Sequence, residues 1–232
     1  MSMDFDSFVL AAATADLADA THPMAREHAD AAEFRMDLAD GDALAAFEAY
    51  DADLPIIATN RVEWEGGEAA DDADRLDALA TAAEYDAVEA IDVELEAMRR
   101  GDAAGIADRI PEDVSIVASV HDFDRTPSIE DLRSLASAAT EHGDVGKVVT
   151  TAESVDDVPR LLSVTREFTA QGSPVATMAM GEPGRHSRAV APIYGSRIGY
   201  APVDPADATA PGQFDVASLA ELVTELAPNP EA

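Results

Sequence analysis

The sequence predicts an α/β protein of one domain, residues 1–232, with the fold of a (β/α)8 TIM barrel. Eight short runs rich in apolar and β-branched residues follow one another along the chain, and each precedes a polar segment with helical Ala/Leu periodicity. The runs start about 20 to 35 residues apart, the length of one strand and one helix. No long linker or change of composition interrupts the series, which favours a closed barrel, with a doubly wound sheet as the alternative.

The same pattern places the individual elements. The helical segment after the fifth run starts with Ser128 as its N-cap and stops at Gly143, and the last outer helix covers residues 215–226. Residues 228–232 are expected to form a disordered tail. The eight expected strands, in order, are Phe8–Ala12, Ala32–Asp37, Leu54–Asn60, Ala87–Leu95, Val114–Phe123, Gly146–Thr151, Pro174–Met180 and Arg197–Val203.

The charge balance excludes several classes of partner. The chain has 47 acidic and 15 basic residues, a net charge of −32, whereas nucleic acids and anionic membranes need a basic surface. No apolar run approaches the roughly 18 residues of a membrane-spanning helix, and the first residues lack the basic region of a signal peptide. A cytoplasmic location is therefore expected. The absence of cysteine excludes disulfides, thiolate metal sites and cysteine nucleophiles.

Lysine is almost absent from the chain. Lys147 is the only one, and the other fourteen basic residues are arginine. Acid excess, abundant alanine and scarce lysine resemble the proteins of salt-accumulating haloarchaea. At molar salt the Debye length falls to about 3 Å, so repulsion among surface carboxylates is screened. We therefore expect the fold to require high salt.

Unusual polar residues, most of them charged, occur at or just after the ends of the expected strands, where a barrel carries its functional site. Such charges are costly at inward positions unless they are paired, so they predict a mutually satisfied network, which can be structural or functional. The residues concerned are Glu33, Arg35, Asp37, Arg61, Glu65, Asp92, Glu94, His121, Asp122, Arg188 and Gln213.

Lys147 is the strongest catalytic candidate. Its apolar neighbours Val145, Val148 and Val149 favour the neutral amine, since burial penalises the charged form. A neutral amine can attack a carbonyl carbon and form a Schiff base. The alternative is a structural lysine that reaches out of the strand end to pair with Asp144.

His121 is the candidate general acid or base, because histidine titrates near neutral pH. The other four histidines lack comparable surroundings, and no two histidines have the spacing of a metal site. A metal is not expected, although the segment 121–124 together with Glu94 leaves a hard cation as a weak alternative.

The loop that follows the seventh strand carries a further candidate, Arg188. A phosphate site and a bidentate carboxylate clamp both fit this position, and a surface ion pair is the structural alternative. Met178 and Met180 lie on one face of the preceding strand, where they serve either as core packing or as a pocket wall.

Seven stretches, taken in order, resemble type I 3-dehydroquinate dehydratases. They are "EFRMD" from Glu33, "TNRVEWEGGE" from Thr59, "IDVEL" from Ile91, "HDFDRTP" from His121, "GKVV" from Gly146, "MAMGEPGRHSR" from Met178 and "APGQ" from Ala210. The resemblance implies a (β/α)8 barrel, usually a homodimer, that needs neither metal nor organic cofactor and acts on the small molecule 3-dehydroquinate. It also implies a lyase that forms 3-dehydroshikimate, the third step of the shikimate pathway.

The resemblance also implies roles for particular residues. Lys147 matches the imine-forming lysine, His121 the proton shuttle, and Glu65 the carboxylate that orients and charges this histidine. The remaining matches are substrate-binding residues: Glu33, Arg35 and Arg61 for hydroxyls and local charge, Arg188 for the carboxylate, Thr209 and Gln213 on the closing loop, and Met178 and Met180 in the pocket wall.

Three departures from the family pattern are visible. Thr209 stands where serine is usual, Ala179 stands where serine is common, and the segment between Tyr200 and Thr209 is longer and more acidic than expected. Two other functions remain open at this point. One is a Schiff-base class I aldolase, which would also carry a lysine on the sixth strand, and the other is a barrel that has lost catalysis and serves as a binding partner.

Overall fold

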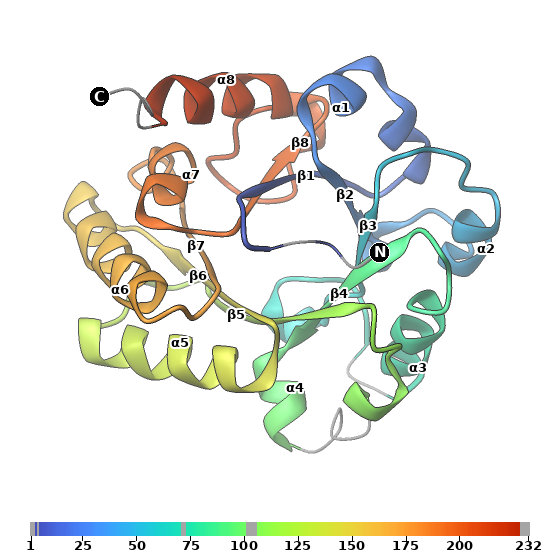
Figure 1. The fold of residues 1–232 in the computed structure, drawn as a ribbon, viewed down its shortest axis with the longest axis horizontal. Helices are drawn as coiled ribbons and strands as arrows, with labels where there is room; N and C mark the ends of the chain where they lie inside the picture. Colours follow the sequence, from blue (N-terminus) through green and yellow to red (C-terminus); the bar gives the residue numbers. More distant parts are fainter. Residues whose placement is uncertain (1–2, 4, 71–72, 101–105, 228–232) are drawn as a thin grey trace.

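The computed structural model describes residues 3, 5–70, 73–100 and 106–227. Within these ranges eight parallel strands form one sheet, in which each strand from β1 to β6 pairs with the next and β1 also pairs with β8. A backbone hydrogen bond from Arg197 N to Val175 O (2.8 Å) links β8 to β7. Figure 1 shows the strands as an inner ring with the helices outside it. The predicted (β/α)8 barrel is confirmed.

All eight expected strands are present, with ends that shift by a few residues. The second strand stops at Arg35 because the chain turns into a 3-10 helix, and the fourth stops at Glu94, where a helix begins directly. The strands are β1 Val9–Thr14, β2 Ala31–Arg35, β3 Ile56–Thr59, β4 Val88–Glu94, β5 Ser115–Asp122, β6 Val145–Thr151, β7 Val175–Met180 and β8 Ile198–Pro202.

The helices follow the strands as expected. Ser128 accepts a hydrogen bond from Asp131 N at the start of α5, and Gly143 ends this helix, as predicted. The expected tail, residues 228–232, lies outside the described residues. The α-helices are α1 Pro23–His28, α2 Ala43–Glu48, α3 Ala73–Ala82, α4 Leu95–Arg100, α5 Ile129–His142, α6 Val158–Ala170, α7 Ser187–Val190 and α8 Val216–Leu226. The 3-10 helices are η1 Leu17–Thr21, η2 Met36–Leu38, η3 Glu63–Glu65, η4 Ala107–Arg109, η5 Val155–Asp157, η6 Ala191–Tyr194 and η7 Pro205–Asp207.

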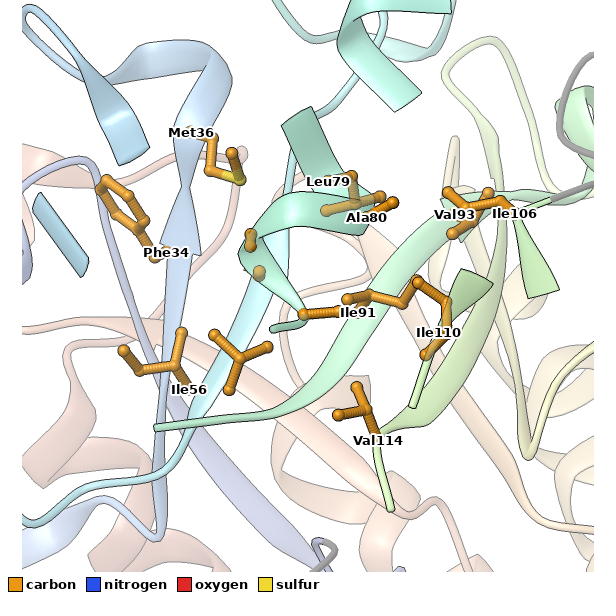
Figure 2. Close-up of a cluster of buried hydrophobic side chains, with 14 of the residues drawn as sticks. Phe34, Met36, Ile56, Leu79, Ala80, Ile91, Val93, Ile106, Ile110 and Val114 are labelled. Atoms are coloured by element: carbon orange, nitrogen blue, oxygen red, sulfur yellow. The ribbon is translucent and has the colours of Figure 1, made fainter. Parts of the chain in front are cut away.

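The outward faces of the strands pack against the helices. Figure 2 shows one such cluster, in which Phe34, Ile56 and Ile91 meet Leu79 and other apolar side chains of the outer layer. Because side chains alternate along a strand, the residues between these outward positions point into the barrel. None of the helices in the described ranges is sufficiently long and apolar to cross a bilayer.

The barrel interior is built in layers contributed by alternate strands. Two lower layers are apolar and fully packed, and Met3 and Phe5 of the N-terminal segment join the same cluster. The next layer up contains ionisable side chains from the four even-numbered strands. The lower layers are Ala31, Ala90, Val145 and Ile198, and Ala11, Ile57, Val117 and Ala176; the polar layer is Glu33, Asp92, Lys147 and Tyr200.

Candidate active site

A pocket opens above the polar layer, at the carboxyl ends of the strands. This is the end at which barrels of this type carry their function. The residues to which the resemblance gives a role all line it: Glu33, Arg35, Arg61, Glu65, His121, Lys147, Met178, Met180, Arg188, Thr209 and Gln213. Four other charged residues expected at the strand ends do not line it: Asp37, Asp92, Glu94 and Asp122. Gly66, Phe123, Val149, Tyr200 and Ala210 complete the lining.

Lys147 lies in the middle of β6 and is 4% exposed. Its Nζ donates to Asp92 Oδ2 at 2.9 Å and lies 3.9 Å from Glu33 Oε1. The ring of Tyr200 covers it, with Nζ 4.0 Å from the ring centroid. The alternative pairing with Asp144 is wrong, because Lys147 points into the barrel whereas Asp144 accepts the backbone N–H of Ile116. The only lysine of the chain is therefore a buried pocket residue.

Arg61 connects the lysine to the neighbouring carboxylates. Its guanidinium donates to Asp92 Oδ1 (2.6 Å), Glu94 Oε1 (2.9 Å) and the hydroxyl of Ser119 (2.7 Å). Burial opposes the charge of Arg61, yet Asp92 and Glu94 raise its pKa well above the usual value. Burial likewise opposes the charge of Asp92, but Arg61 and Lys147 hold its pKa well below the usual range. The expected network of paired charges is present, and within it the surroundings favour the charged forms of Arg61 and Asp92.

His121 and Glu65 form a hydrogen-bonded pair beside this network, with Nδ1 and Oε2 2.8 Å apart. Burial raises the pKa of Glu65 to about 8, with Arg61 opposing. Burial also lowers the pKa of His121 well below its usual value, and Arg61 and Lys147 add to this effect. Burial thus opposes the charge on both members of the expected pair. These surroundings favour a neutral imidazole.

The loop after β3 is held close to the end of β5. Gly66 has φ 77°, and a Cβ at this position would lie 2.3 Å from Cζ of Phe123. The ring of Phe123 stacks beside His121, with centroids 6.0 Å apart. Glycine at position 66 thus provides both the left-handed conformation and the space that let Glu65 reach the histidine.

Arg188 reaches the opposite wall of the pocket. Its strongest contacts are weak ones, to Met178 Sδ at 3.6 Å and to the carbonyl of Pro211 at 3.5 Å, and Nε has no hydrogen-bond partner among the described residues. Burial lowers the pKa of Arg188 to about 10. Arg185, the other arginine of this loop, packs over Phe214 and does not line the pocket. Among the described residues Arg188 therefore has no ion-pair partner, which leaves its buried guanidinium able to hold an anion.

Two further sets of contacts hold the remaining pocket residues. Arg35 forms a bidentate pair with Asp37 (2.8 and 2.6 Å), and Thr59 donates its hydroxyl to Glu33 at 3.1 Å. On the loop after β8, the side-chain oxygen of Gln213 accepts the backbone N–H of Ala210 at 3.1 Å and contacts the Thr209 hydroxyl. The hydroxyl of Thr209 is therefore at the pocket mouth, despite the long segment that precedes it.

A sequence model of the family described as type I 3-dehydroquinase matches residues 8–229. The chain belongs to this family. It is 58% identical over 228 residues to 3-dehydroquinate dehydratase of Haloarcula marismortui, covering 97% of this chain and 98% of that protein, and 49% identical to the Halobacterium salinarum protein of the same name, covering 97% and 100%. The crystal structure of 3-dehydroquinate dehydratase from Geobacillus kaustophilus superposes with a TM-score of 0.81 at 26% identity, covering 95% of this chain and 91% of that chain.

Within this family's pattern, the departure at Ala179 does not reach the pocket. Ala179 faces the outer layer, where its backbone N–H donates to the hydroxyl of Ser187 at 2.8 Å. Among the described residues no group of three or more acidic or histidine side chains could hold a metal ion. Glu94, considered above for a hard cation, is instead bound by Arg61 and Arg75.

Three residues in or beside this dehydroquinase site received no individual role from the sequence, and of these only Asp92 was named as a member of the expected charge network. Asp92, the closest partner of Lys147, was visible as the first of two acids spaced to share the inner face of β4. Tyr200 lies in an expected strand, but nothing in the sequence distinguishes a tyrosine that covers a lysine from one in the core. Arg75 lies on the outer helix α3, where an arginine is usually a surface residue.

Proposed function

We propose that this chain is a 3-dehydroquinate dehydratase that forms an imine between Lys147 and its substrate. The observation that carries the proposal is the position of Lys147 Nζ at the pocket floor, 2.9 Å from Asp92, in a chain that belongs to the type I 3-dehydroquinases. The product is 3-dehydroshikimate, so the reaction belongs to the shikimate pathway.

The chemistry needs an amine and a proton carrier. The neutral amine of Lys147 attacks the C3 carbonyl carbon, and the carbonyl oxygen leaves as water when the iminium forms. His121 takes the C2 proton while the electron pair flows into the iminium to give an enamine. Return of this pair expels the C1 hydroxyl, which His121 protonates to water, and hydrolysis of the imine releases the product. A neutral imidazole, which burial favours here, suits the first of these proton transfers.

Binding of the substrate would complete the charge balance. A carboxylate on Arg188 would supply the partner that this buried guanidinium lacks among the described residues. Glu33, Arg35 and Arg61 are proposed to hold hydroxyls and local charge, Met178 and Met180 to form the apolar wall, and Thr209 and Gln213 to close over the site.

The aldolase alternative has less support. A sugar phosphate would need several backbone donors and a second cation beside Arg188. Arg185 packs over Phe214 instead, and the family to which the chain belongs is that of the dehydroquinases. A barrel without catalysis is also disfavoured, because Lys147, His121 and Glu65 occur together around one pocket.

Trapping with borohydride tests the proposal. The protein is incubated with 3-dehydroquinate and sodium borohydride, digested, and mapped by mass spectrometry. We expect the reduced adduct on Lys147 and parallel loss of dehydratase activity. Absence of that adduct from a preparation that turns over substrate would overturn the imine mechanism, and absence of turnover would overturn the proposed function.

Three further properties are proposed with this function: one folding domain, a homodimer, and a cytoplasmic location. Eight strands in one sheet support the single domain, and the family resemblance supports the homodimer. A single unfolding transition would test the first property, and a dimer mass by light scattering would test the second.

A requirement for high salt is proposed as well. The net charge of −32 and the relatives from Haloarcula and Halobacterium support a fold that needs high salt. The melting temperature should fall when the protein is dialysed into dilute buffer, and an unchanged value would contradict this.

A further inference from the structure

A buried arginine on the outer helix α3 contacts the charge network from outside the barrel. Arg75 is 4% exposed, and its NH1 group donates to Glu94 Oε2 at 2.8 Å and to the backbone carbonyl of Asn60 at 2.9 Å. The side chain of Asn60 returns a hydrogen bond to the carbonyl of Arg75 at 3.1 Å. The helix is thereby fastened to the residue that precedes Arg61.

Glu94 transmits this contact into the barrel. Its second oxygen, Oε1, accepts from Arg61 NH1 at 2.9 Å and from the backbone N–H of Val62 at 3.2 Å. Both chain neighbours of Arg61 are therefore held, Asn60 by Arg75 and Val62 by Glu94. The guanidinium of Arg61 then spans Asp92, which binds Lys147, and lies 3.8 Å from Glu65, which binds His121.

We propose that Arg75 is a positioning residue of the dehydratase, acting through Glu94 to fix the place and the charge balance of Arg61. The inference rests on the function proposed above. Arg75 does not line the pocket, so it acts on the reaction only through other residues. By neutralising Glu94 it leaves the positive charge of Arg61 available to Asp92 and Glu65.

The proposal predicts shifts of opposite sign in the pH profile of kcat. Without the Arg75 charge, the negative charge of Glu94 is no longer neutralised, and this raises the pKa values of Glu65 and His121. Loss of the Glu94 charge lowers both pKa values. The charged groups that act on this pair from the surrounding elements are Arg35, Arg61, Asp92, Glu94 and Lys147.

The experiment measures kcat and KM for 3-dehydroquinate against pH at constant salt. Arg75→Met should lower kcat about 10- to 100-fold, as expected when a site is slightly misplaced, and should shift the profile to higher pH by about one unit. Glu94→Gln should shift the profile to lower pH, and the double variant should return it toward that of the wild type. Arg75→Lys keeps the charge and should retain the wild-type profile with a smaller loss of kcat.

The matched control is Arg133→Met, which removes an outer-helix arginine that does not line the pocket and whose ion pair with Glu167 (2.8 Å) is partly exposed. It should leave kcat and the profile unchanged. If Arg75→Met does not fold, Arg75→Lys and Glu94→Gln still decide the sign of the shift. An active wild type whose Arg75 and Glu94 variants keep its pH profile would overturn the inference alone. An inactive wild type would overturn the proposed function and this inference with it.

Discussion

The lower and upper halves of the barrel interior use the same strands in opposite ways. Ala31 and Glu33, Ala90 and Asp92, and Val145 and Lys147 are each two positions apart, which is roughly 7 Å along each strand. The lower positions are apolar and pack around Met3 and Phe5, while the upper positions carry charge.

The difference shows how a barrel separates stability from chemistry. In the lower half each side chain is satisfied by contact alone, so its contribution is the burial of apolar surface. In the upper half the cost of burying a charge is offset where a neighbour of opposite charge lies within hydrogen-bonding distance, as for Lys147 and Asp92. Substitutions should therefore affect stability in the lower half and activity in the upper half.

The largest effect is expected at Lys147. In Lys147→Arg a cation remains beside Asp92, but a guanidinium cannot become the neutral amine that attacks a ketone. We expect kcat to fall by about 10⁴-fold or more, as when a catalytic nucleophile is removed, and the borohydride adduct to disappear. Val145→Ala, one inward position lower on β6, is the control and should keep kcat while lowering the melting temperature. Appreciable turnover by Lys147→Arg would contradict the assignment of catalysis to the upper half of the barrel interior.

A smaller loss of activity is expected at His121. Removing the imidazole in His121→Ala should lower kcat by about 10²- to 10⁴-fold, the usual contribution of a general acid or base. The side chain lies at the pocket and not in the packed lower layers, so the circular dichroism spectrum should stay that of the wild type. Turnover near the wild-type rate would refute its role as proton carrier.

The next effect, a dependence of stability on pH, comes from Glu65. Its pKa is about 8 in the folded protein against 4.5 ordinarily, so between these values the folded protein holds a proton that the unfolded chain has lost. The free energy of unfolding should therefore decrease as pH rises through this window, by about 1.4 kcal/mol per unit. Glu65→Gln removes this contribution. Denaturant unfolding at constant salt should therefore show that the free energy of unfolding of the variant, relative to that of the wild type, increases from pH 5 to pH 8. A constant difference would show that Glu65 is ionised when folded.

The lowered pKa of His121 acts in the other direction. Below about pH 6.5 the unfolded chain binds a proton that the folded protein does not, so stability is lost as the pH falls. Because wild type and Glu65→Gln both keep the histidine, their difference at each pH reports mainly on the glutamate.

The smallest effect is expected in the lower half, at Ile57. Ile57→Val deletes one methyl group from a fully buried side chain and should cost about 0.5–1.5 kcal/mol of unfolding free energy. Since Ile57 does not line the pocket, kcat and KM should match those of the wild type. A change in kcat without a change in stability would contradict the assignment of stability, and not activity, to the lower half of the barrel interior.

Most of the fold could be predicted because each strand and helix is encoded locally. The cap at Ser128 and the stop at Gly143 are read from neighbouring residues, and they are found where expected. The candidate site could be predicted in the same way, since residues that end parallel strands must meet at one end of a barrel. Motifs such as "HDFDRTP" then supplied the expected roles.

The pairings could not be predicted, because they depend on register and burial. That Lys147 binds Asp92 and not Asp144 follows from the inward direction of its side chain on β6. That Glu65 and His121 favour their neutral forms follows from desolvation, which no spacing of residues reveals.

By itself the sequence determined the barrel, the acidic surface and the identity of the one lysine, because strand periodicity, composition and side-chain chemistry are properties of the chain. The tertiary structure alone decided which charges neutralise one another. It brought Arg75, from a helix outside the barrel, to Glu94 inside it, and so connected the outer layer to Arg61. Such a contact depends on the packing of α3 against the sheet, and the free energy of a buried charge is set by the neighbours that packing supplies.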